Sequence, residues 1–164
     1  MRIFFIFLVF LFFLTSCTSD IIGVVLKNDI YSSRVIEMMN DHQESNSNLL
    51  KKYLDEDVFI EYSGKIYNGK QNLIEVWKAE FYYFSDVFFD KKEVFTTFNK
   101  DRSYTTIFKA NWNASGNFTN NSYSVYSFYE FKWKYDRIFE IRVHWNNEPY
   151  YKEWDKLIKS NKYE

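Results

Sequence analysis

Alternating apolar and polar residues mark the second half of the chain. The pattern runs through residues 87–98, 104–112, 123–135 and 139–145, with polar turns between the segments, most clearly at 99–102 and 113–122. A period of two is typical of β-strands that bury one face and expose the other. In the last segment we expect one continuous apolar row to face the core: Phe139, Ile141, Val143 and Trp145. The residues between them, including His144, are then expected to face outward.

Helical spacing and shorter segments fill the first half. From Gln71 onward apolar residues recur at positions 73, 74, 77, 81 and 84, which predicts an amphipathic helix. Another helix is expected to start at a cap on Ser19 or Asp20 and to run through Met39, followed by a short helix over 49–54 and a turn at 55–57. Residues 58–62 read as a strand, 65–70 as a short ribbon, and Pro149 as the opening of a terminal helix that reaches about residue 159. This order predicts an α+β fold in which helices cover one face of a curved antiparallel sheet.

The N-terminus has the pattern of an export signal. After Met1 and Arg2, residues 3–14 are uninterruptedly apolar, and as a helix they would span about 18 Å, less than a bilayer core. The next residues, Leu14-Thr15-Ser16-Cys17, resemble a bacterial lipobox, in which the cysteine is acylated and becomes the first residue. We therefore expect residues 1–16 to be a cleaved signal peptide, 17–26 a lipidated N-terminus with a short lead-in, and 27–164 a single domain, lipid-anchored to a bacterial membrane, on the periplasmic side or at the cell surface. The alternative is an ordinary secretory signal and a protein without the lipid.

Composition limits the class of protein. A chain of 164 residues with formal net charge −1 is long enough for one domain and lacks the basic surplus of nucleic-acid-binding proteins. Aromatic residues make up 23% of it, a composition that suits β-sheets. Its one cysteine, Cys17, excludes an internal disulfide.

Four ordered stretches resemble the SnoaL-like branch of the nuclear transport factor 2 (NTF2-like) superfamily. They are Asp57-Val58-Phe59-Ile60-Glu61-Tyr62, the segment from Tyr67-Asn68-Gly69 to Trp77, Ser85-Asp86-Val87-Phe88-Phe89, and the closing stretch Arg137-Ile138-Phe139-Glu140-Ile141-Arg142-Val143-His144-Trp145. The resemblance implies a cone-shaped α+β fold whose curved antiparallel sheet carries helices on its concave face around an apolar pocket. It also implies a homodimer formed through the outer sheet face.

The resemblance identifies no residue that could act as a catalytic acid or base. Where the ketosteroid-isomerase branch has its aspartate base this chain has Tyr62, and where the limonene-epoxide-hydrolase branch has an essential aspartate it has Val143. A valine transfers no proton, and an ordinary tyrosine is a poor base at neutral pH. The remaining catalytic candidate is His144, weakened by its place on the outward face, while His42 has no partner at a useful spacing and is expected to be exposed.

Binding is therefore favoured over catalysis. The expected pocket residues are Tyr62, Trp77, Phe81, Tyr129, Val143 and Trp145, each of which is equally compatible with plain core packing. No cluster has metal-ligand spacing, and no motif indicates a cofactor. We expect a membrane-anchored, non-catalytic protein that binds a small apolar ligand or a protein partner. The alternative is a SnoaL-like isomerase, cyclase or hydratase with an unrecognised acid–base set, and a carboxylate or histidine inside a roomy pocket would favour it.

Overall fold

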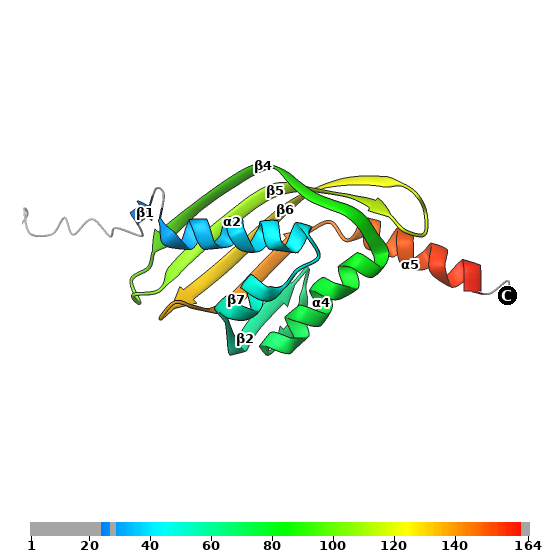
Figure 1. Cartoon of the computed structure of the whole chain (residues 1–164). Helices are drawn as coiled ribbons and strands as arrows, with labels where there is room; N and C mark the ends of the chain where they lie inside the picture. Colours follow the sequence, from blue (N-terminus) through cyan, green and yellow to red (C-terminus); the bar gives the residue numbers. More distant parts are fainter. Residues whose placement is uncertain (1–23, 27–28, 162–164) are drawn as a thin grey trace, which may run out of the picture.

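A computed structural model of the chain describes residues 24–26 and 29–161. These residues form four helices and one seven-stranded sheet (Figure 1). In chain order the elements are β1 (Val24–Leu26), α2 (Ile30–Gln43), α3 (Asn48–Tyr53), β2 (Leu54–Tyr62), β3 (Lys65–Asn68), α4 (Lys70–Tyr83), β4 (Phe84–Phe98), β5 (Tyr104–Gly116), β6 (Ser122–Lys134), β7 (Arg137–Trp145) and α5 (Glu148–Asn161). The predicted signal peptide, Cys17 and the predicted caps Ser19 and Asp20 lie outside the described residues.

The sheet is open and strongly curved, with the strand order β1-β4-β5-β6-β7-β2-β3. Neighbouring strands are antiparallel except for β2 and β7, which pair in parallel, so the expectation of a wholly antiparallel sheet was wrong at that pair. Two register shifts interrupt β4, near Asp86 and Lys91, and both residues have positive φ. Such bulges bend a strand and increase its twist, which lets the sheet curve around α2 and α4 (Figure 1).

The alternation seen in the sequence defines the core. The inward row of β5 includes Phe108, Ala110 and Trp112, and the inward row of β6 includes Tyr129, Phe131 and Trp133, all of them buried as predicted. Helices α2 and α4 pack on this face with their own apolar stripes. The α+β architecture predicted from the sequence is therefore confirmed.

The predicted inner row of β7 is wrong at its first residue. Lys132 of β6 pairs with Glu140, whereas the next residue, Trp133, pairs with Ile138. Phe139 is thus the additional residue of a bulge and is only partly buried, and Ile138 takes the inward place instead. One inserted residue reverses the parity of a strand, and for this reason the alternation rule failed there.

The first helix begins later than predicted. Asp29 caps α2, and its Oδ1 accepts hydrogen bonds of 2.9 Å from the backbone amides of Tyr31 and Ser32. Residues 24–26 are not helical but pair with residues 96–98 of β4 at the edge of the sheet. The turn expected at 55–57 is instead the irregular start of β2, where the register against β7 shifts. Within the described part of the chain, none of the helices has the length and apolarity needed to cross a bilayer.

Candidate functional site

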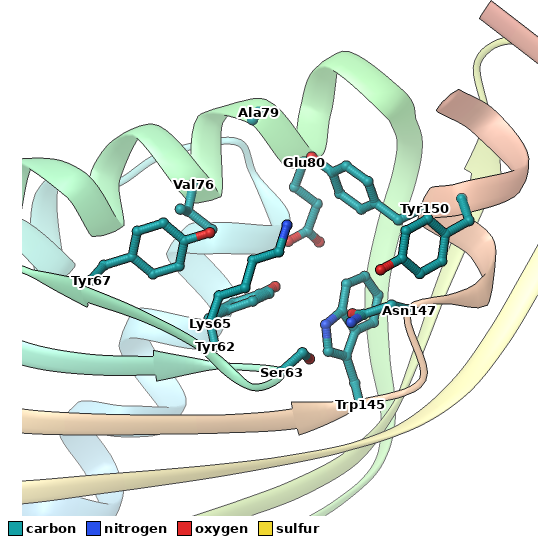
Figure 2. Close-up of a pocket in the computed structure, with 11 residues that line it drawn as sticks. Tyr62, Ser63, Lys65, Tyr67, Val76, Ala79, Glu80, Trp145, Asn147 and Tyr150 are labelled. Atoms are coloured by element: carbon teal, nitrogen blue, oxygen red, sulfur yellow. The ribbon is translucent and has the colours of Figure 1, made fainter. Parts of the chain in front are cut away.

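A cavity of about 260 Å³ opens at one end of the sheet, where the β2–β3 hairpin, α4 and the start of α5 meet (Figure 2). Its volume lies just below the range of roughly 300–1,000 Å³ that is typical of small-molecule pockets. The hairpin contributes Tyr62, Ser63, Lys65 and Tyr67, and α4 contributes Val76, Ala79 and Glu80. The end of β7, the following connection and α5 contribute Trp145, Asn147, Tyr150 and Tyr151. Five of the eleven lining residues are therefore aromatic.

A buried carboxylate lies at the deep side of this cavity. Glu80 is only 3% exposed, although it lines the cavity and Figure 2 shows its carboxylate turned toward it. The indole Nε1–H of Trp112, from β5, donates a hydrogen bond of 2.7 Å to Glu80 Oε1, and His42 Nε2 lies 3.4 Å from the same oxygen. Among the described residues no hydrogen bond reaches the second oxygen, Oε2. Glu80 is thus fixed through one oxygen while the other is available to a ligand.

His42 lies next to Glu80 in the core, and the prediction that this histidine is exposed was wrong. The histidine is 2% exposed, and its ring centroid lies 4.3 Å from that of Trp77 and 5.0 Å from that of Phe81. It lies in the last turn of α2, on the same buried face of the helix as Val35 and Met39. Glu80 supplies the partner that the local sequence lacks.

Neighbouring tyrosines are held in the neutral form. Burial raises the pKa of Tyr62 and of Tyr129, and the negative charge of Glu80 raises both further. The pKa of Tyr150 is raised by burial first, then by Tyr83 and Glu80. These phenols therefore stay protonated near neutral pH and do not act as bases.

Two further polar groups of the cavity wall have no partner. Ser63 Oγ and Trp145 Nε1 are buried, and neither makes a hydrogen bond within the described residues. A buried polar atom without a partner is costly, by about 1–3 kcal/mol. Both residues line the cavity.

The structure divides the predicted pocket residues into two groups. Tyr62 and Trp145 line the cavity, with ring centroids 6.2 Å apart. The others are core residues: Trp77, Tyr129 and Val143 are buried, and Phe81 packs partly buried against the core. The prediction missed Glu80, Ser63 and the contribution of α5.

The weak catalytic candidate His144 lies on the outer face of the sheet. It is exposed, whereas its neighbour Val143 is fully buried, as the alternation predicted. Its ring centroid is 6.0 Å from that of Phe128, which lies opposite on β6. Among the described residues no three His, Cys, Asp or Glu side chains are grouped so that they would hold a metal ion.

The chain matches no protein-family profile and no curated protein sequence. Its fold, however, is similar to several solved structures. A proposed isomerase from Bacillus subtilis shares 16% identity at a TM-score of 0.60 over 76% of this chain and 91% of its own. A proposed SnoaL-like polyketide cyclase from Shewanella denitrificans shares 12% at 0.61, over 78% and 98%. An NTF2-like protein of unknown function from Burkholderia pseudomallei shares 10% at 0.56, over 70% and 88%. The chain therefore has the NTF2-like fold of the SnoaL-like proteins, as the sequence resemblance predicted.

Proposed function

We propose that this NTF2-like domain binds a small, largely apolar molecule in the cavity next to Glu80, and that a lipid on Cys17 holds it at a bacterial membrane. The observation that carries the binding proposal is the combination of aromatic walls with three polar atoms that lack partners: Glu80 Oε2, Ser63 Oγ and Trp145 Nε1. A few convergent polar groups in an apolar wall are the usual composition of a ligand pocket.

The position of the cavity agrees with such an anchor. Strand β1 lies at the end of the sheet where β7 begins. It pairs with the end of β4, which pairs with the start of β5; the start of β5 pairs with the end of β6, and the end of β6 pairs with the start of β7 at Arg137. The cavity lies at the other end of β7, beside Trp145. Over the eight residue steps of β7 this separation is roughly 26 Å. A domain anchored through residues before β1 would open its cavity away from the bilayer.

A fluorescent probe tests the binding proposal. N-phenyl-1-naphthylamine is neutral at pH 7 and becomes fluorescent in apolar surroundings, so we expect the purified protein to bind it in a saturable manner. Val76→Trp fills the cavity from α4 and should abolish the signal. Lys78→Trp, on the exposed side of the same helix, is the matched control and should leave it unchanged. Equal binding by wild type and Val76→Trp would place the probe elsewhere and contradict the proposal.

The second candidate function is an isomerase, cyclase or hydratase in which Glu80 transfers a proton. A specific observation favours it: the carboxylate is oriented by Trp112 and His42 and is turned toward the cavity, as a general acid or base must be to reach a substrate. Incubation with small cyclic ketones in D₂O, followed by NMR, tests this candidate. If Glu80 is the base, wild type exchanges the α-protons and Glu80→Gln does not, although both bind the naphthylamine. Equal exchange by the two proteins rules out this role of Glu80.

A further inference from the structure

We infer that the natural ligand of this cavity is an organic cation, an amine carried on an apolar body. The inference rests on the proposed binding function and names its ligand class. Its basis is the arrangement of charge in the cavity wall. Only two of the lining residues are charged, Glu80 and Lys65, and they differ in burial. Glu80 is 3% exposed, whereas Lys65 is exposed at the rim.

The buried charge is incompletely compensated. A carboxylate removed from water needs hydrogen bonds or an opposite charge close by. Trp112 provides one short hydrogen bond, but His42 Nε2 is 3.4 Å away and approaches the same oxygen, so Oε2 remains without a partner among the described residues. Lys65, the other charged residue of the wall, is exposed, and no ion pair joins it to Glu80 among the described residues. A ligand ammonium at Oε2 would supply the missing counter-charge.

The aromatic walls suit the same ligand class. Trp145 lies between Tyr62 and Tyr150, with ring centroids 6.2 Å and 6.4 Å away and steep interplanar angles of 78° and 86°. All three residues line the cavity, and an aromatic ring attracts a cation that comes within about 6 Å of its face. The two tyrosines stay neutral, because burial raises the pKa of Tyr62 and of Tyr150 and the charge of Glu80 adds to the effect. The carboxylate and the aromatic rings therefore both favour a positively charged ligand.

Other ligand classes fit less well. An organic anion would lie against the negative charge of Glu80 and gain only the exposed Lys65. A neutral molecule would fill the cavity but leave the carboxylate without a counter-charge.

Three probes of one shape and different charge test the inference. They are benzylamine, which is protonated at pH 7, the neutral benzyl alcohol and the anionic benzoate, each titrated calorimetrically into the purified protein. We expect benzylammonium to bind at least 10-fold more tightly than benzyl alcohol, and benzoate to bind most weakly. Glu80→Gln should reduce the preference for benzylammonium over benzyl alcohol to less than about 3-fold. A single cooperative thermal transition of Glu80→Gln shows that the variant folds. Lys65→Met should strengthen benzylammonium binding, because it removes a positive charge from the cavity wall.

Glu75→Gln is the matched control, since Glu75 is exposed on the outer side of α4 and should have no effect on any of the three affinities. Equal or tighter binding of benzyl alcohol or benzoate by wild type overturns the inference. So does a benzylammonium preference that survives in Glu80→Gln, or failure of all three probes to bind. Saturable binding of the neutral naphthylamine is measured separately, so the proposal that the cavity binds a ligand is tested independently of the ligand's charge.

Discussion

Glu153 is expected to hold α5 against the sheet, and with it the side of the cavity formed by Tyr150 and Tyr151. Its side chain is fully buried. Oε2 accepts hydrogen bonds from the backbone amides of Phe118 at 2.7 Å and Thr119 at 3.1 Å. Oε1 accepts from the hydroxyls of Thr119 and Tyr123. One carboxylate thus ties the terminal helix to the loop between β5 and β6.

The change Glu153→Gln keeps the shape of this side chain and removes its charge. The two hydroxyls can rotate to accept from the new amide group, so the main loss is charge assistance to the two backbone hydrogen bonds. Hydrogen bonds to charged groups contribute about 1.5–3 kcal/mol and neutral ones about 0.5–1.5 kcal/mol, a difference of roughly 1 kcal/mol each. We therefore expect the free energy of unfolding to fall by about 2 kcal/mol, which lowers Tm by about 4–8 °C in a domain of this size.

The pH dependence of stability provides a second test of Glu153. Burial alone would raise the pKa of this carboxyl and is the largest single influence. The hydrogen bonds from Thr119, Tyr123 and the two amides together outweigh it, so the pKa lies below the ordinary value of 4.5. Since the folded pKa is lowered, the stabilisation is complete above the ordinary value and is lost as the pH falls through the folded pKa. The difference in Tm between wild type and Glu153→Gln should therefore be full at pH 7 and shrink below about pH 4.5.

Thermal melts followed by circular dichroism at stepped pH measure both effects. Asp155→Asn is the control, because Asp155 lies on the same helix but is exposed and pairs with Lys159 one turn away, an interaction worth about 0.3–0.5 kcal/mol. A Glu153→Gln protein that melts within 1–2 °C of wild type at pH 7 would refute the reasoning, given the ~2–4 °C expected per kcal/mol. A difference in Tm that does not change with pH would refute the role of the charge.

Three other predictions concern the two faces of the sheet and the N-terminus. His144→Ala should change the free energy of unfolding by no more than about 0.5 kcal/mol. Trp133→Ala leaves a cavity at a fully buried position and should lower the free energy of unfolding by about 3–5 kcal/mol. Urea titrations that give the opposite order would show that the inner and outer faces of the sheet are wrongly assigned. Cys17→Ser should abolish labelling by a fatty-acid probe in a bacterial host, and equal labelling of both proteins would exclude the proposed lipid. The protein is expected to dimerise through its outer sheet face, where Tyr126 is 61% exposed beside Phe128, and sedimentation showing a persistent monomer at high concentration would exclude this.

Local rules were sufficient for the long strands. In β5 and β6 the sequence alternation and the observed burial agree almost residue by residue, because each strand has one face on the core and no bulge shifts its register. The same rule failed at Phe139, where a bulge inserts one residue without any signal in the local pattern. The start of α2 was misplaced for a different reason: Ser19, Asp20 and Asp29 are all acceptable caps, and pairing of residues 24–26 with β4 decides among them. Such pairing is a long-range contact that no local spacing reports.

Glu80 and His42 did have a signal in the sequence. Glu80 lies seven residues after Leu73 and three after Trp77, and His42 lies seven after Val35 and three after Met39. Each polar residue therefore occupies a position of the apolar stripe of its helix, where an unpaired charge is too costly to bury. Two such residues on two helices that share one core indicate that they meet, and that Glu80 supplies the partner of His42. The sequence does not indicate how α2 and α4 are placed relative to each other, because that depends on the curvature of the sheet. For the same reason it does not indicate that the carboxylate of Glu80 lies at a cavity.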